Sequence, residues 1–139
     1  MDALQLKLCD IQGRLFEISV DMNCSSRDFV EAFMKSNVAK ALDSSFNHMQ
    51  WAGEEYLFDE LVSSHQELMQ MEGKVLSKDL MFWVGYLYRF WCFYSGEASN
   101  QIYKIADADM MFRNYLMFHT FDPVVAIENL KEIHRQKKS

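Results

Sequence analysis

The sequence predicts an all-α fold, a single compact bundle of about six to seven helices that residues 1–139 form as one domain. Three observations favour this class. Half of the residues are apolar and 14% are aromatic, which is enough for one core in a chain of ordinary domain length. One proline and five glycines are too few for the many turns of a sandwich or barrel. Polar and apolar residues nowhere alternate with a convincing period of two, so we expect little or no sheet.

The first helix is predicted by apolar residues that recur at steps of three and four from Leu4 to Met22. This spacing lines one face of an α-helix. Gly13 lies inside the stretch and costs about 1 kcal/mol relative to alanine. A close crossing with another helix would explain its presence. The stripe consists of Leu4, Leu8, Ile11, Leu15, Ile18 and Met22.

Serines mark the expected starts of the next helices. Ser25 or Ser26 is suited to cap a short helix, and the chain restarts at Ser36 and again at Ser44. A long helix is then predicted from about Phe46 to Met71. The residues expected to face inward are Phe29, Val30, Phe33 and Met34 in the short helix, and Met49, Tyr56, Leu57, Leu61, Leu68 and Met71 in the long one.

The second half of the chain begins with a helix from about Lys78 to Tyr94, capped by Ser77 and ended by Gly96. Because this helix is apolar almost all round, we expect it at the centre of the bundle. Its apolar run, Leu80–Tyr94, contains Arg89 and is shorter than the ~20 residues of a membrane span. The remaining helices are predicted at Glu97–Ile105, at Ala108–Phe118 after an Asp107 cap, and from Asp122-Pro123 to about Arg135.

The charge distribution limits the classes of partner. The net charge is −6, and Leu42–Gly73 contains no Lys or Arg. An acidic body of this kind repels phosphate backbones, which argues against binding to nucleic acid. The basic cluster at Lys131–Lys138 is typical of a solvated helix end. Three widely spaced cysteines with no signal peptide ahead of them predict reduced thiols in a cytoplasmic protein.

Residues for catalysis or metal binding are sparse. The four histidines have no partner at metal-ligand spacing, and no Gly-x-Ser-x-Gly or phosphate-binding loop is present. Cys92 lies in the most apolar helix and is expected to be inert, whereas Cys9 and Cys24 are expected at a surface or edge without a nearby base. We therefore expect no metal, no cofactor and no enzymatic activity. The histidines are His48, His65, His119 and His134.

Two groups of residues are candidate sites. The first combines aromatic anchors with carboxylates, which suits a protein interface, although a solvated helix face has the same composition. The second surrounds Arg89, the only charge in the apolar run Leu80–Tyr94, which must be paired if it is buried. Glu54, Glu55 or Glu97 would pair it in a structural role, and otherwise it would anchor a ligand. The first group is Trp51, Glu54, Glu55, Tyr56, Asp59 and Glu60, and the second is Tyr86, Tyr88, Arg89 and Trp91.

A further concentration of large apolar residues lies in the predicted Ala108–Phe118 helix. One face of a helix of this length cannot bury them all. Some are therefore expected in the core or between neighbouring helices, and others at a partner surface. They are Met110, Met111, Phe112, Tyr115, Met117 and Phe118.

Five stretches, Met49–Leu57, Tyr94–Glu97, Ile102–Lys104, Arg113–Thr120 and Asp122–Ile133, resemble a small family of proteins from Firmicutes and other gut bacteria. The resemblance covers nearly the whole chain. In that family the gene often lies beside genes for a small protein and an ADP-ribosyltransferase-like toxin. The resemblance therefore implies an antitoxin or accessory role with such a toxin as the cognate partner. It assigns no functional residue, because no catalytic residues are established for the family.

These observations favour a non-enzymatic bacterial protein-binding module as the first hypothesis. Its acidic, aromatic face would cover the basic cleft in which an ADP-ribosyltransferase holds the pyrophosphate of NAD. The alternative is a small-molecule sensor or enzyme with a pocket near Arg89. A third hypothesis is a homodimer that uses the apolar stripe of the first helix as a two-fold seam.

Overall fold

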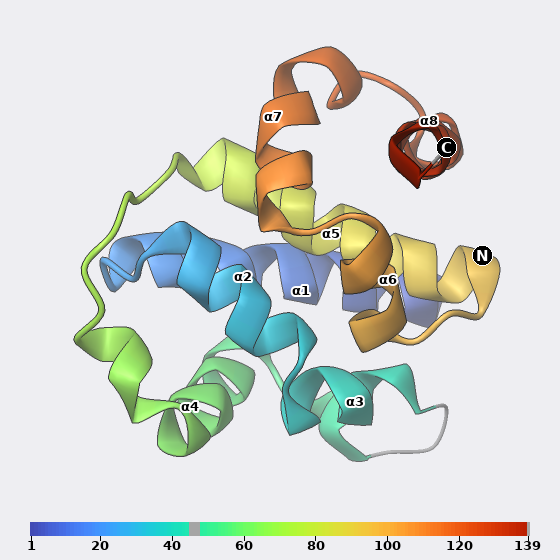
Figure 1. Cartoon of the computed structure of the whole chain (residues 1–139). Coiled ribbons are helices and arrows are strands. Elements are labelled where there is room, and N and C mark those ends of the chain that lie inside the picture. Colours follow the sequence, from blue (N-terminus) through green and yellow to red (C-terminus); the bar gives the residue numbers. More distant parts are fainter. Residues whose placement is uncertain (45–47, 139) are drawn as a thin grey trace.

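The computed structural model describes residues 1–44 and 48–138. This part of the chain forms eight α-helices and two short 3-10 helices, with no strand (Figure 1). The predicted all-α class is confirmed, with more helices than the expected six or seven. The elements are α1 (Ala3–Asp21), α2 (Ser26–Met34), α3 (Asn37–Asp43), η1 (His48–Trp51), α4 (Glu54–Ser64), η2 (Gln66–Met69), α5 (Lys78–Ser95), α6 (Ser99–Ile105), α7 (Ala108–Phe118) and α8 (Pro123–Lys138).

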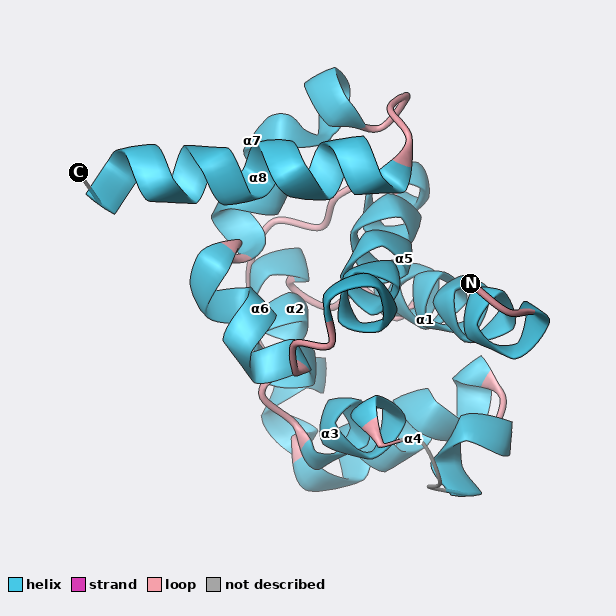
Figure 2. Cartoon of the chain, turned by 90° about the vertical axis from the view of Figure 1, so that its right-hand side faces the viewer, coloured by secondary structure: helices cyan, strands magenta, loops and turns pink. Residues whose placement is uncertain are grey.

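The helices pack in three levels. Helices α1 and α5 lie in the middle, with α7 and α8 on one side and α3 and α4 on the opposite side (Figure 2). Helix α5 contacts α1, α6, α7 and α8, while α4 packs on α1 and α3. Among the described residues, none of the helices combines the length and apolar character that crossing a bilayer requires.

Two glycines allow α1 and α5 to cross closely. A Cβ atom on Gly85 would lie 2.6 Å from the carbonyl oxygen of Gln12. A Cβ atom on Gly13 would lie 2.7 Å from the ring of Phe82. The Gln12 side chain donates a hydrogen bond of 2.9 Å to the Gly85 carbonyl oxygen, which ties the helices at this point. The close crossing expected at Gly13 is therefore confirmed.

Several local start and stop signals act as predicted, although Ser44, an expected restart, ends α3. The side chains of Ser25, Ser36, Ser77 and Asp107 each accept a hydrogen bond from the backbone N–H three residues later. These bonds satisfy N–H groups that have no partner within the helix. Gly96 ends α5 in the left-handed conformation, with φ of 77°, which glycine adopts without the strain of a Cβ atom.

The predicted long helix from Phe46 to Met71 is wrong. Phe46 itself lies outside the described residues, and the rest divides into η1, α4 and η2. Gly53 has extended backbone angles and begins α4, and His65, with φ of −134° and ψ of 59°, ends it. Residues 71–77 then form a connection without regular structure. Non-helical backbone at these two residues interrupts the helix, although the apolar pattern that suggested one helix continues through them.

This division changes which side chains reach the core. Leu57, Leu61 and Leu68 are buried as expected. Tyr56 and Met71 were predicted to face inward, but they are 51% and 42% exposed. Phe58 is buried instead. The reason is that α4 begins at Glu54, so its inward face differs from that of the predicted longer helix.

The apolar stripe of α1 packs mainly within the chain. Leu8 and Leu15 are buried, together with Phe16 beside the stripe. Only the ends of the stripe are exposed, at Leu4 and Met22. The stripe is therefore largely occupied and does not provide the continuous seam that the homodimer hypothesis requires.

Helix α7 contributes to both the core and the surface. Met110, Met111 and Phe118 are buried, whereas Met117 is 64% exposed. Its neighbour Leu116 is 82% exposed. One face of α7 therefore belongs to the core, and Leu116 and Met117 lie on its exposed side.

Candidate functional site

Arg89 lies at the centre of a buried polar network that joins α1, α3, α5 and α6. The side chain is fully buried, and each of its three guanidinium nitrogens donates a hydrogen bond. The acceptors are the Gln12 amide oxygen at 2.7 Å, the Asp43 carboxylate at 2.6 Å and the Ser99 hydroxyl at 3.3 Å. We call Arg89, Gln12, Asp43 and Ser99 the Arg89 network.

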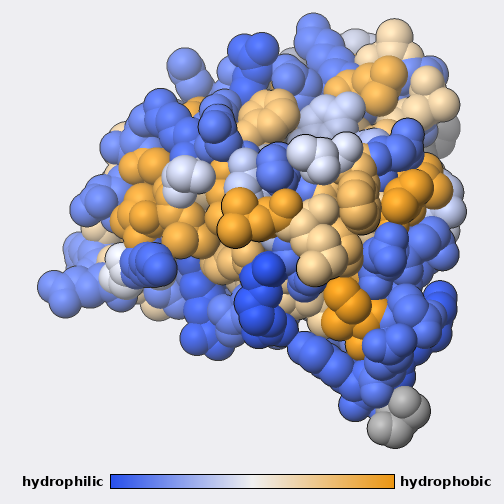
Figure 3. Space-filling model, turned by 90° about the horizontal axis from the view of Figure 1, so that it is seen from above, coloured by the Kyte–Doolittle hydropathy of each residue, from blue (hydrophilic) through white to orange (hydrophobic). Residues whose placement is uncertain are grey.

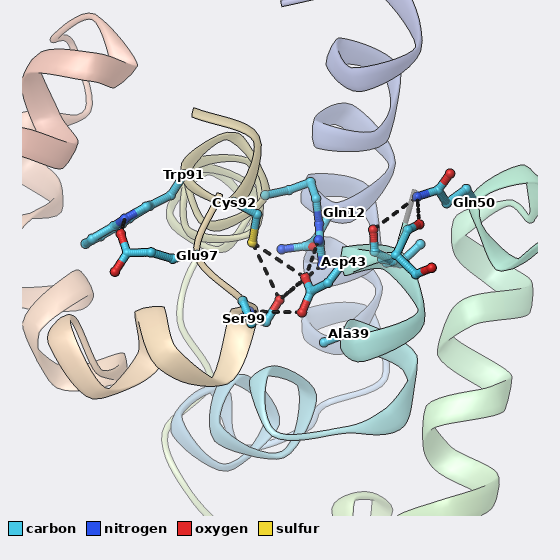
Figure 4. A network of polar contacts seen from close by, with 12 residues as sticks. Gln12, Ala39, Asp43, Gln50, Trp91, Cys92, Glu97 and Ser99 are labelled. Carbon is cyan, nitrogen blue, oxygen red and sulfur yellow. Dashed lines mark hydrogen bonds and ion pairs between the residues drawn. The ribbon is translucent and has the colours of Figure 1, made fainter. Parts of the chain in front are cut away.

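Both carboxylate oxygens of Asp43, the residue that neutralises Arg89, also accept hydrogen bonds from Ser99. Its Oδ1 accepts a hydrogen bond of 2.7 Å from the Ser99 hydroxyl, and its Oδ2 accepts one of 3.0 Å from the Ser99 N–H. Figure 4 shows Asp43 and Ser99 facing each other, with Gln12 and Cys92 close by. Because the charges and hydrogen-bonding groups are matched within the network, its chemistry is that of a structural ion pair.

Arg89 is buried and is paired with a carboxylate, as the structural interpretation requires, but its partner is none of the three glutamates proposed for it. Neither Glu54 nor Glu55 reaches it. Glu97 instead accepts a hydrogen bond of 3.1 Å from the Trp91 indole and lies 3.6 Å from the Lys131 ammonium. Burial raises the pKa of the Glu97 carboxyl, but the hydrogen bonds from Trp91 and Ser95 and the charge of Lys131 outweigh it and lower that pKa overall.

The four residues expected to line a pocket near Arg89 do not share one. Tyr88 is fully buried, and its hydroxyl donates a hydrogen bond of 2.6 Å to the Ala106 carbonyl oxygen. Trp91 turns toward Glu97. Tyr86 alone lines an open hollow, which lies between α5 and α7. Positions two apart on a helix point to different faces, and this separates Tyr86 from Tyr88. The separation of these side chains and the pairing of Arg89 count against the alternative of a pocket near Arg89.

The second candidate group forms an exposed surface on η1 and α4. Trp51 is 78% exposed, which is unusual for a large apolar side chain, and Tyr56 is 51% exposed. Glu55, Asp59 and Glu60 are also exposed, and Glu54 is partly exposed. We call these residues the acidic surface: Trp51, Glu54, Glu55, Tyr56, Asp59 and Glu60.

The carboxylates of the acidic surface form no ion pair within the part of the chain that the structure describes. Among the described residues, no Lys, Arg or His nitrogen forms an ion pair with any of the four. Glu54 and Glu55 lie in the first turn of α4, where the positive end of the helix dipole favours them. The presence of Glu54 and Glu55 is therefore explained by their favourable interaction with the dipole of α4. Asp59 and Glu60 lie further along the helix, where this explanation does not apply.

The border of the acidic surface is more mixed in charge. A hollow of about 330 Å³ separates Trp51 and Glu54 from α1. Its α1 side carries Lys7 and Arg14, and Arg14 forms an ion pair of 2.8 Å with Asp10. A partner that covers Trp51 would therefore meet negative charge on α4 and a basic edge on α1.

The cysteines are all buried, which corrects the prediction of surface or edge positions for Cys9 and Cys24. Burial raises the pKa of the Cys9 thiol to about 12, and it also raises the pKa of Cys24. Burial likewise raises the pKa of the Cys92 thiol, against the opposing charge of Arg89. The thiols are therefore held in the protonated form, which is a poor nucleophile and a poor metal ligand.

Metal-ligating side chains do not gather in the part of the chain that the structure describes. No group of three or more His, Cys, Asp or Glu residues there has the arrangement to hold an ion. Two of the histidines instead sit at helix ends. The Nδ1 atoms of His65 and His119 lie 3.2 and 2.8 Å from the carbonyl oxygens of Leu61 and Tyr115.

The basic end of the chain belongs to the last turns of α8. Arg135 pairs with Glu132 at 2.6 Å, and Lys131 lies near both Glu97 and Glu128. Positive side chains are favoured at a helix C-terminus by the helix dipole. The interpretation of this cluster as a helix end is consistent with these contacts.

Comparison with protein-family models, curated proteins and solved structures finds no match for this chain.

Proposed function

We propose that the protein is a non-enzymatic binding module that uses the acidic surface to bind a partner protein with a basic face. The observation that carries the proposal is the exposure of Trp51, 78%, beside carboxylates that form no ion pair among the described residues. Tryptophan and tyrosine are the side chains that most often anchor interfaces. A cluster of unpaired negative charge raises the rate of association with a basic surface.

The non-enzymatic part of the proposal is supported by the state of the reactive groups. Burial holds the thiols in the protonated form, and the Arg89 network is occupied by its own members. The proposed location is the cytoplasm, where free thiols stay reduced.

The resemblance to the gut-bacterial family suggests the class of partner, a neighbour-encoded ADP-ribosyltransferase-like toxin. Such an enzyme holds the pyrophosphate of NAD with basic groups. The carboxylates of the acidic surface would face these groups, and Trp51 and Tyr56 would pack against the walls of the cleft. The proposed role is therefore that of an antitoxin or accessory protein.

The test is an affinity capture of the tagged chain from its native bacterium with the flanking genes intact. We expect a neighbour-encoded protein to co-purify in stoichiometric amount. This co-purification should be lost in the variant Trp51→Ala and also in the double charge reversal Glu54→Lys/Glu55→Lys. The matched control is Glu132→Lys, a charge reversal on α8, at the opposite side of the molecule (Figure 2).

Capture of the chain alone would contradict the proposal. So would equal capture by the Trp51→Ala variant, because the anchor would then lie elsewhere. If the partner is captured as expected, co-expression should show that the wild-type chain suppresses the toxicity of the partner and that the double reversal does not.

A further inference from the structure

A second feature of the surface, away from the acidic surface, is a pocket of about 330 Å³ between α5, α7 and the start of α8. Its walls are mainly aromatic, and Figure 3 shows apolar side chains gathered on the face that carries α7 and α8. The volume lies at the lower end of the range for small-molecule sites. The aromatic residues are Phe82, Trp83, Tyr86, Tyr115, His119 and Phe121. We call this the aromatic pocket.

The rings of the aromatic pocket are arranged on two walls. On α5, the rings of Phe82 and Tyr86 stack with centroids 5.9 Å apart. On α7, the rings of Tyr115 and His119 stack at 4.5 Å. Trp83 joins the walls, since its ring meets that of Tyr115 at 5.6 Å with 66° between the planes. The packing of Phe82 over Gly13 fixes the first wall against α1.

One carboxylate lies at this pocket. Asp79, in the first turn of α5, is exposed and contributes to the lining. The adjacent Lys78 does not neutralise it, because its ammonium forms an ion pair of 2.6 Å with Asp21 on α1. No Lys or Arg lines the pocket in the part of the chain that the structure describes.

His119 is oriented by its own helix. Its Nδ1 lies 2.8 Å from the Tyr115 carbonyl oxygen, which can only accept, so Nδ1 donates this hydrogen bond. The carboxylate of Asp79 is the charged group in the lining, and it suits a positively charged ligand.

We propose that the aromatic pocket binds a small organic cation, a quaternary ammonium or methylated amine, between its rings with Asp79 as the counter-charge. The faces of aromatic rings carry the negative part of a quadrupole, and cages of such rings bind quaternary ammonium groups. An anion would be repelled by Asp79 and by the ring faces. A neutral apolar ligand would gain nothing from Asp79.

The test compares two ligands of nearly the same shape that differ in charge. Choline carries a quaternary nitrogen, and 3,3-dimethylbutan-1-ol has a carbon atom in its place. We expect choline to shift the indole N–H resonance of Trp83 in a saturable titration. The neutral alcohol should bind at least about threefold more weakly, the smallest effect expected of a cation–π contact.

Variants separate the counter-charge from the rings. Asp79→Asn should weaken choline binding by about threefold or more and leave the alcohol unchanged. The matched control, Glu67→Gln, removes one negative charge from an exposed position in η2 and should leave both ligands unchanged. Tyr115→Leu, checked for folding by its melting curve, should weaken choline more than the alcohol.

Equal affinity for the two ligands in the wild-type protein would overturn the proposal, and this comparison requires no variant to fold. No saturable shift of the Trp83 resonance by choline would overturn it as well, as would an unchanged choline affinity in Asp79→Asn. These outcomes are independent of the proposed function, which depends on Trp51 and the opposite side of the molecule.

Discussion

The Arg89 network and the acidic surface differ in how their charges are placed: the charge of Arg89 is buried and paired, and the charges of the acidic surface are exposed to solvent. Within the network, a fully buried guanidinium has a partner at every nitrogen, including a carboxylate at 2.6 Å. On the acidic surface, the carboxylates are exposed or partly exposed and form no ion pair with any residue that the structure describes. A buried charge must be matched because its desolvation costs several kcal/mol, whereas an exposed charge is solvated by water. The network therefore stabilises the fold, and the acidic surface is available for another molecule.

The largest expected effect comes from removing one side of the buried ion pair. Asp43→Ala leaves Arg89 buried without a counter-charge, so we expect the free energy of unfolding to fall by about 3–5 kcal/mol. Urea denaturation monitored by circular dichroism measures it. The double variant Arg89→Met/Asp43→Leu removes both charges and should lose less than the sum of the single losses. Strictly additive losses would show that the two groups are not coupled.

The buried thiol of Cys9 should make the free energy of unfolding depend on pH. The pKa of Cys9 is about 12 in the folded chain, against 9.0 for an ordinary thiol, because of burial. Between these values the folded state binds more protons, so raising the pH favours unfolding. The contribution is fully present below pH 9 and falls by up to about 1.4 kcal/mol per pH unit above it.

The measurement is the free energy of unfolding between pH 7 and pH 10 for the wild type and Cys9→Ala. Burial also raises the pKa of Tyr103 to about 12, so both proteins should weaken at alkaline pH. The wild type should weaken more steeply. Parallel curves would mean that the thiol ionises without unfolding.

The smallest expected effect on stability belongs to the acidic surface. Glu55→Lys changes an exposed side chain without an ion pair in the described chain, so the free energy of unfolding should change by less than about 0.5 kcal/mol. The reversal loses a favourable charge near the start of α4 and gains an attraction to Asp59 four residues later. A loss above 1 kcal/mol in the same urea experiment would assign the acidic surface a structural role and weaken the contrast with Asp43→Ala.

The two candidate sites differed in how far the sequence could predict them. The members of the acidic surface lie within ten residues of each other, so their proximity followed from the chain, and the structure added their exposure. Arg89 was expected to be paired if it is buried, because it is the only charge in the apolar run Leu80–Tyr94, and the structure shows both. Its partner Asp43 was missed, since that residue is separated from it by 46 positions and follows no pattern that points to α5.

The aromatic pocket was missed as a unit, although its parts were noted. Tyr86 and Tyr115 appeared in two separate groups, one on each of two helices. Their approach depends on how α7 packs on α5, which residue spacing does not encode. The incorrect helix from Phe46 to Met71 has a related cause, since an apolar pattern continues through Gly53 and His65 while the backbone does not.

The sequence by itself determined the features that depend on groups a few residues apart. Helix starts at Ser77 and Asp107, the helix end at Gly96 and the burial of α5 all follow from local hydrogen bonds, backbone freedom and apolar spacing. The tertiary structure alone decided which carboxylate neutralises Arg89, which glycines lie at the α1–α5 crossing and which rings form the aromatic pocket. Those outcomes are set by contacts between residues far apart in the chain, and they exist only once the helices have packed.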